Sequence, residues 1–139
     1  MEIKYHNLLL ANYSLLNQGL HERIRKSELS PGQPKVLNYL SVNNGAAQKD
    51  IAEGCYLTPG SLTTILTRME KLGMVERRRE DGNMKEIHVY LTEKGKKLSD
   101  KAEDIFNELN KIALTGLTPE EKDIFLRTFL KIYANMQKF

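Results

Sequence analysis

With 139 residues, the chain is long enough for one compact domain, or for a small domain with helical arms. Its 40% hydrophobic and 28% charged residues exclude a disordered chain, and its net charge of +3 permits binding to a polyanion without demonstrating it. The single cysteine, Cys55, excludes an internal disulfide, and no stretch approaches the ~20 apolar residues of a membrane span. We therefore expect a cytoplasmic protein with no signal peptide and no membrane association.

The N-terminal segment, from about Ile3 to Arg25, is predicted to form one long helix. Apolar residues recur there at spacings of three and four, at Leu9, Tyr13, Leu16, Leu20 and Ile24. This stripe is larger than a small neighbouring domain needs for itself. We expect it to pack against something else.

Residues 30–57 predict two short helices and a tight turn. Ser30-Pro31-Gly32-Gln33 has the form of a capping box, with Pro31 at the first position of a helix that runs to about Val42. The sequence Asn-Asn-Gly at 43–45 stops that helix. A second helix is expected at 47–54, and the turn at 55–57 after it predicts a helix-turn-helix.

The stretch 57–80 organises the chain. Thr58 is a good N-cap, Pro59 suits the first helical position, and Gly73 ends the helix in a left-handed conformation. One stripe of the helix is apolar, with Leu62, Ile65, Leu66, Met69 and Leu72. The opposite side is small, polar and basic, with Gly60, Ser61, Thr63, Thr64, Thr67, Arg68 and Lys71. Such a face fits a DNA major groove, where hydroxyls contact base edges and arginine reaches guanine or phosphate; an ordinary solvated helix face is the alternative.

A hairpin is predicted directly after this helix. Its strands are residues 74–79 and 85–91 and its link is residues 80–84, with Ile87, Val89 and Leu91 facing inward and His88 and Tyr90 outward. Its cations are Arg77, Arg78, Arg79 and Lys85. Residues 68–85 hold six basic and four acidic residues, whereas residues 100–123 hold three and seven. A helix in the groove with an adjacent basic ribbon is the winged helix-turn-helix arrangement.

Two further helices are predicted at the C-terminal end. In the first, Leu98, Ala102, Ile105, Leu109 and Ile112 alternate four and three apart, like a short heptad seam. The second follows a capping box at Thr118-Pro119-Glu120-Glu121 and carries Phe125, Phe129, Ile132, Tyr133, Met136 and Phe139. An intramolecular core is one use for these stripes, but we expect an interface shared by two copies.

The predicted fold class is mainly α with a small β-hairpin: a winged helix-turn-helix flanked by N- and C-terminal dimerisation helices. We place the DNA-binding domain at residues 30–92. The helical dimerisation region comprises residues 1–29 and 93–139.

This order of elements resembles the MarR family of bacterial transcriptional regulators. The resemblance covers nearly the whole chain and rests on Gln48 to Ala52, Leu57 to Arg68, Met69 to Arg77, and Leu91 to Gly95. It implies an obligate homodimer whose recognition helices enter successive major grooves of roughly palindromic double-stranded DNA, with the wings in the flanking minor grooves. The candidate DNA contacts are Thr58, Gly60, Ser61, Thr63, Thr64, Thr67, Arg68, Lys71, Arg77, Arg78, Arg79, Asn83 and Lys85.

One departure from the family concerns the wing. The family commonly has Asp-x-Arg where this chain has Asn83-Met84-Lys85. Lysine is a point charge rather than a fork, and asparagine cannot form the orienting ion pair, so we expect Arg77, Arg78 and Arg79 to supply part of the attraction. Arg77 matches a frequent arginine after the recognition helix, for which a structural role is the alternative.

Family members often respond to small aromatic or phenolic compounds bound between the winged unit and the dimer helices. Tyr13, His21 and Tyr39 are the candidate effector contacts, with plain packing or surface roles as the alternative. Some relatives sense oxidants through a cysteine in the first helix, and this chain has none there. We interpret Cys55, which stands where a leucine is usually buried, as a small core hydrophobe rather than a redox residue.

The sequence predicts no active site. His6, His21 and His88 are far apart and lack metal-ligand spacing, and no phosphate-binding glycine-rich loop occurs, so we expect no enzyme, no metal and no cofactor. The first of two hypotheses is a sequence-specific DNA-binding regulator: a homodimeric repressor of a pseudo-palindromic promoter site, released by a small-molecule effector. The alternative is a winged-helix protein-interaction module, which more often shows exposed aromatic or leucine anchors than a threonine-rich face.

Overall fold

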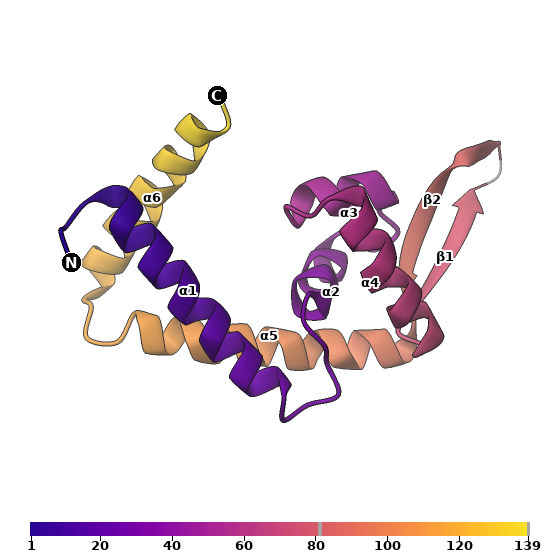
Figure 1. The fold of residues 1–139 in the computed structure, drawn as a ribbon, viewed down its shortest axis with the longest axis horizontal. Helices are drawn as coiled ribbons and strands as arrows, with labels where there is room; N and C mark the ends of the chain where they lie inside the picture. The colour runs from indigo at the N-terminus through magenta and orange to yellow at the C-terminus, as the bar shows by residue number, and fades with distance from the viewer. Residues whose placement is uncertain (81, 139) are drawn as a thin grey trace. The chain divides into compact units, whose positions relative to one another are not determined.

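The computed structural model describes residues 1–80 and 82–138. In chain order its elements are α1 (Tyr5–Ile24), α2 (Gln33–Val42), α3 (Gln48–Gly54), α4 (Pro59–Lys71), β1 (Val75–Glu80), β2 (Asn83–Leu91), α5 (Glu93–Ala113) and α6 (Pro119–Met136) (Figure 1). The chain divides into two units, Met1–Asn107 and Glu108–Phe139. Within the described ranges, no helix has both the length and the apolar character needed to cross a membrane. The predicted fold class, mainly α with a small β-hairpin, is confirmed.

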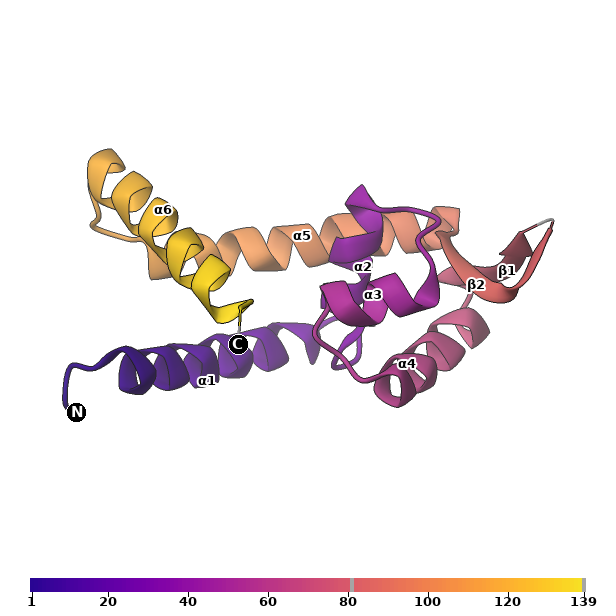
Figure 2. The same ribbon diagram turned by 90° about the horizontal axis from the view of Figure 1, so that it is seen from above.

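A buried apolar cluster holds the first unit together. It receives side chains from all of the unit's helices, from Ile24 on α1 to Leu98 on α5, and from both strands through Val75 and Val89. Figures 1 and 2 show α2 beside the first half of α5, and the hairpin continuing from the end of α4. Burying one large aliphatic side chain stabilises a fold by about 1.5–3 kcal/mol. The buried Leu62, Leu66 and Met69 therefore fix which face α4 turns away from the core.

The start of α2 differs from the prediction. The helix begins at Gln33, with Gly32 as its N-cap at a φ of 87°, and not at Pro31. Residues 30–33 instead form a turn, in which the Gln33 amide donates to the Ser30 carbonyl at 3.1 Å. Proline followed by glycine favours such a turn because glycine accepts the positive φ. Half of the predicted capping box is present, since the Ser30 amide donates to Gln33 Oε1 at 2.9 Å.

Helix α4 has the ends that the sequence predicts. The Thr58 hydroxyl accepts a hydrogen bond from the Ser61 amide at 3.1 Å, and Pro59 lies in the first turn. Gly73 follows the helix at a φ of 74°. In the turn between α3 and α4, the left-handed residue is Tyr56, with a φ of 54°.

The hairpin is longer than predicted. Strands β1 and β2 pair antiparallel from Val75↔Leu91 to Arg79↔Ile87, and after an irregularity Glu80 pairs with Asn83. The link is therefore residues 81–82 and not 80–84; of these, Asp81 lies outside the described residues. Gly82 has a φ of 83°, which glycine adopts at little cost, and this allows so short a link.

His88 and Tyr90 were predicted to face outward into solvent, but both are partly covered. The segment 45–47 runs along β2, with the Gly45 amide donating to the Val89 carbonyl at 2.8 Å and the Val89 amide donating to the Ala46 carbonyl at 3.0 Å. Both side chains are half-buried beside this segment, while Val89 is buried as predicted. The alternation identifies residues that share a face, but it contains no information about a distant loop.

Of the helices expected to form a shared interface, α1 and α6 are largely exposed in a single chain. The stripe of α5 is not, because Leu98 and Ala102 lie in the core of the first unit. On α1, Ile24 is buried but Tyr13 is 60% exposed. Helix α6 has the predicted capping box at Thr118, and none of its described residues is buried. Phe125 and Phe129 stack there with ring centroids 5.3 Å apart, and Phe139 lies outside the described residues. An intramolecular core therefore does not account for the apolar stripe of α6.

Candidate nucleic-acid interface

The polar face of α4 lies on the surface, as the sequence predicts. All of its members are exposed, namely Thr58, Gly60, Ser61, Thr63, Thr64, Thr67, Arg68 and Lys71. Within the described chain, Arg68 and Lys71 form no ion pair, so their charges remain available to an external anion. On the opposite side Leu62, Leu66 and Met69 are buried, and Ile65 and Leu72 lie at the partly exposed edges.

The threonine hydroxyls of this face already donate within the helix. Thr63 Oγ1 donates to the Pro59 carbonyl at 2.9 Å, Thr64 Oγ1 to the Gly60 carbonyl at 3.2 Å, and Thr67 Oγ1 to the Thr63 carbonyl at 2.8 Å. What these side chains offer outward is an oxygen lone pair and a methyl group. Amino groups of adenine and cytosine, and the methyl group of thymine, are the major-groove features that such groups match.

Thr58 and Ser61 are used in the start of the helix. Besides accepting from the Ser61 amide, Thr58 donates through Oγ1 to Ser61 Oγ at 2.9 Å. These two side chains therefore satisfy polar groups at the N-terminus of α4 before any ligand is considered. Any contact that they make with a ligand would be additional to this capping role.

The wing arginines differ in their surroundings. Arg77 is half-buried and its guanidinium meets Glu70 at 2.9 Å. Arg78 is exposed, pairs with Glu76 at 2.8 Å, and its guanidinium carbon lies 4.3 Å from the centroid of the Tyr90 ring. The hydrogen bond that Arg78 donates to Glu76 raises the pKa of Arg78, which stays charged at any ordinary pH.

Arg79 and Lys85 are exposed near the tip of the hairpin. Asn83, another predicted wing contact, is the first residue of β2, and its side chain lies outside the described atoms. The structure therefore presents cations along the outer half of the wing at Arg78, Arg79 and Lys85.

His88 attaches the wing to the segment 45–47, whereas Tyr90 joins the two strands of the wing. His88 Nδ1 lies 2.8 Å from the Gly45 carbonyl and Nε2 lies 3.4 Å from a carboxylate oxygen of Glu86. The Gly45 carbonyl raises the pKa of His88, and Glu80 and Glu86 act in the same direction. The Tyr90 hydroxyl donates to Glu80, which raises the pKa of that hydroxyl.

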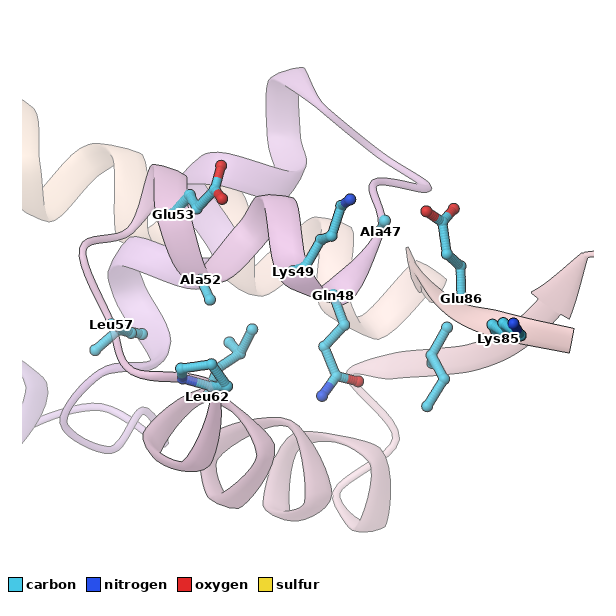
Figure 3. Close-up of a pocket in the computed structure, with 11 residues that line it drawn as sticks. Ala47, Gln48, Lys49, Ala52, Glu53, Leu57, Leu62, Lys85 and Glu86 are labelled. Atoms are coloured by element: carbon cyan, nitrogen blue, oxygen red, sulfur yellow. The ribbon is translucent and has the colours of Figure 1, made fainter. Parts of the chain in front are cut away.

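A groove of about 410 Å³ lies between α3, the start of α4 and β2 (Figure 3). Its lining is mainly apolar, with the charged residues Lys49, Glu53, Lys85 and Glu86. Figure 3 shows Gln48 pointing from α3 towards α4, where its Nε2 donates to Thr63 Oγ1 at 3.1 Å. This bond links the first helix of the helix-turn-helix to the polar face of the second.

The three predicted effector contacts do not line this groove. Tyr13 and His21 are exposed on α1, eight residues or about 12 Å apart along the helix axis. Tyr39 is half-buried on α2 and packs against Gly54, where an added Cβ would lie 2.2 Å from a ring carbon. Within residues 1–80 and 82–138, no group of three or more His, Cys, Asp and Glu side chains is placed to hold a metal ion.

Cys55 is a core residue, as interpreted from the sequence. It is 6% exposed, and its Sγ donates to the Lys35 carbonyl at 3.5 Å. Burial raises the pKa of the thiol, which disfavours the reactive thiolate. These properties agree with a packing role.

Two residues of this surface were missed by the sequence analysis, Gln48 and Glu70. Each bonds to a side chain far along the chain, Gln48 to Thr63 and Glu70 to Arg77. For Gln48 the sequence holds no signal. For Glu70 a weak one exists, because Glu70 and Arg77 carry opposite charges on either side of the Gly73 turn.

The sequence of the chain is similar to those of known transcriptional regulators. The family model described as "MarR family" matches residues 27–83. The regulator FarR of Neisseria gonorrhoeae is 28% identical over 131 residues, which cover 94% of this chain and 88% of FarR. The regulator TtmR of Methylorubrum extorquens is 31% identical over 99 residues, covering 71% of this chain but only 50% of TtmR.

A solved structure shares the whole fold. The Staphylococcus aureus MepR–DNA complex has a TM-score of 0.86 at 21% identity, covering 97% of this chain and 99% of the MepR chain. At that identity the likeness supports the fold alone. Taken with the matched segment and the two relatives, it supports a winged-helix protein similar to the MarR family, whose members are transcriptional regulators and not enzymes.

Proposed function

We propose that the chain is a sequence-specific DNA-binding regulator, a homodimeric repressor that occludes a pseudo-palindromic promoter site. The observation that carries the proposal is the exposed face of α4, which combines three threonines with Arg68 and Lys71 and has its apolar side buried. Such a face suits base edges and phosphates. The MepR fold neighbour is a DNA complex, which supports the same use of the fold here.

In this proposal α4 enters the major groove and the wing enters the neighbouring minor groove. Thr63, Thr64 and Arg68 contact base edges, while Lys71, Arg78, Arg79 and Lys85 neutralise phosphates. Thr58, Gly60 and Ser61 allow the start of the helix to approach the DNA, and Thr67 contributes its methyl group. Asn83 remains a proposed wing contact.

Dimerisation is proposed through α1, α5 and α6. Its support is the set of large apolar side chains that a single chain leaves exposed, including Leu10 and Leu15 on α1 and Phe125, Phe129 and Leu130 on α6. Exposed apolar surface of this extent marks interaction sites in soluble proteins. A two-fold dimer would read two half-sites about one helical turn apart.

Release by a small aromatic or phenolic effector is a finer part of the proposal. Tyr13, His21 and Tyr39 are its proposed contacts. The test is whether a simple phenolic acid weakens binding to DNA, and whether Tyr39→Phe, which keeps the ring against Gly54, removes that response without changing binding in its absence. As a regulator of chromosomal promoters, the protein would act in the cytoplasm.

The deciding experiment is fluorescence anisotropy, with duplex DNA from upstream of the protein's own gene and a scrambled duplex, each at two salt concentrations. Tight binding to the first, a wide gap to the second and a steep salt dependence are expected. The upstream duplex is supplemented by one that the protein enriches from a randomised pool. Equally weak binding to all duplexes, with no enrichment, would contradict DNA recognition and favour the protein-interaction module.

A further inference from the structure

Glu70 and Arg77 join the recognition helix to the wing. Glu70 lies in the last turn of α4, and Arg77 lies on β1 beyond the Gly73 turn. Arg77 Nη2 donates to Glu70 Oε1 at 2.9 Å, and the Arg77 backbone amide donates to Glu70 Oε2 at 3.2 Å. Both oxygens of one carboxylate therefore bind one residue of the strand.

The same arginine also reaches the polar face of α4. Its Nη2 approaches Thr67 Oγ1 at 3.4 Å, while Thr67 Oγ1 donates to the Thr63 carbonyl. The Thr67 oxygen thus has a donor and an acceptor inside the protein. This arrangement leaves the second lone pair and the methyl group of Thr67 for a ligand.

The pair is placed where it can control the angle of the wing. Backbone bonds close the turn as far as Met74, whose amide donates to the Met69 carbonyl at 2.9 Å. The Glu70–Arg77 contacts add a tie three residues further along β1. Because β1 pairs with a strand on one side only, the Arg77 amide needs an acceptor outside the sheet, and Glu70 supplies it.

The surroundings of the two side chains support an internal role. The Arg77 side chain is 20% exposed and that of Glu70 is 43% exposed. The hydrogen bond from Arg77 lowers the pKa of Glu70, so the carboxylate is ionised throughout the neutral range. Arg78, the next cation along β1, is 55% exposed by comparison.

We propose that Glu70 and Arg77 form a clamp that holds the wing in position against α4, so that Arg77 is a positioning residue and not a phosphate contact. The inference rests on the proposed DNA-binding function. A helix and a wing that must engage DNA together lose less conformational freedom on binding if their relative orientation is already fixed. Glu70 therefore favours DNA binding although it carries a negative charge close to the interface.

The test is whether removal of the Glu70 carboxylate raises or lowers the affinity for DNA. Affinity is measured for the wild type, E70A, R77A and E70A/R77A, on the duplex that the wild type enriches from a randomised pool and on a scrambled duplex, over a range of salt. Removing a carboxylate near DNA should strengthen binding by electrostatics alone, whereas loss of a clamp should weaken it. We expect E70A and R77A each to lower affinity about tenfold, the double variant to be no weaker than the single ones, and the salt slope to stay unchanged.

Different results would overturn the clamp. Tighter binding by E70A, additive losses in the double variant, or a slope reduced by about one in R77A alone would make Arg77 a direct phosphate contact. E93A/K96A is the matched control, because Glu93 and Lys96 form an exposed ion pair at 3.4 Å at the start of α5. It should bind as the wild type does.

A measurement without DNA separates the clamp from the proposed function. Hydrogen exchange of the Arg77 amide should accelerate in E70A, while buried amides such as that of Val89 should keep their protection and report an intact fold. Unchanged exchange at Arg77 would refute the clamp. Failure of the wild type to enrich any duplex would instead refute DNA recognition, and the exchange result would still decide whether the clamp exists.

Discussion

Three threonines determine the chemistry of the polar face of α4, because their hydroxyl hydrogens are donated to backbone carbonyls one turn earlier. Substituting Thr64 with alanine removes one acceptor and one methyl group. We expect a loss of about 1–3 kcal/mol at the cognate site and little change on scrambled DNA. Arg68→Ala should behave similarly if it contacts a base, and it should also reduce the salt slope if it contacts a phosphate.

Thr115 is a matched control for Thr64. It is exposed, and its hydroxyl donates to the Lys111 carbonyl at 2.7 Å in the same manner. Thr115→Ala should leave binding to either duplex unchanged in anisotropy titrations. An equal loss for Thr64→Ala on cognate and scrambled DNA would remove its base-reading role.

His88 should make the stability of the protein depend on pH. Its pKa is raised, mainly by the bond to the Gly45 carbonyl, with Glu80 and Glu86 acting in the same direction and burial opposing them. The protonated form is therefore favoured in the folded protein. Its stabilising contribution is complete below the ordinary histidine pKa of about 6.5 and is lost as the pH rises through the folded value.

The measurement is the thermal midpoint at several pH values between about 6 and about 8. The wild type should lose stability relative to His88→Gln as the pH rises through this window, so the two curves converge at its upper end. His6→Gln, on the exposed start of α1, serves as the control and should run parallel to the wild type. Parallel curves for His88→Gln as well would contradict the assigned contribution.

At the scale of elements, the tightest backbone approach lies where α5 begins. A Cβ added to Gly95 would lie 2.0 Å from the Met74 carbonyl oxygen, so the helix and the start of β1 would have to separate. Gly95→Ala should destabilise the fold by about 1–3 kcal/mol or more, measured by denaturant unfolding.

Gly60 provides the opposite case for comparison. Nothing lies within 4 Å of a Cβ added there, and the residue is in the first turn of α4. Gly60→Ala should leave the free energy of unfolding unchanged or raise it by up to about 1 kcal/mol. Equal effects for the two substitutions would mean that the contact at Gly95 is relieved by a small shift.

The sequence predicted the elements well because their signals are local. The N-cap Thr58, the capping box at Thr118 and the apolar stripe of α4 each depend on residues within a few positions of one another. The predicted start of α2 was wrong because the same short stretch also favours a proline–glycine turn, and the chain forms this turn before the helix begins.

The site was predicted less completely, since its organisation depends on contacts between distant residues. The exposed face of α4 followed from helical periodicity alone. By contrast, the approach of Gly45 to His88 spans 43 positions, and the bond from Gln48 to Thr63 joins two separate helices. No property of a single segment reports such partners, so the support that the segment 45–47 gives to β2 could not be predicted from the sequence.

At the scale of the whole molecule, the proposed dimer should depend on α6. Deleting the chain from Thr118 onward removes this helix and all of its exposed aromatic side chains, so we expect the truncated protein to be monomeric in sedimentation velocity experiments. It should bind DNA far more weakly than the full chain, because one half-site is then engaged at a time. A folded truncated protein that still dimerises, or that binds DNA as a monomer with full affinity, would refute this role for α6.

The uncovered apolar side chains of α6 have a thermodynamic consequence as well. If a second copy covers them, folding and association become one equilibrium, and mass action makes the melting temperature rise with protein concentration. The concentration of the protein in a cell would then set the fraction of chains that are present as folded dimers. Occupancy of a target site would vary more steeply than linearly with the number of copies, so a modest change in expression would act as a switch.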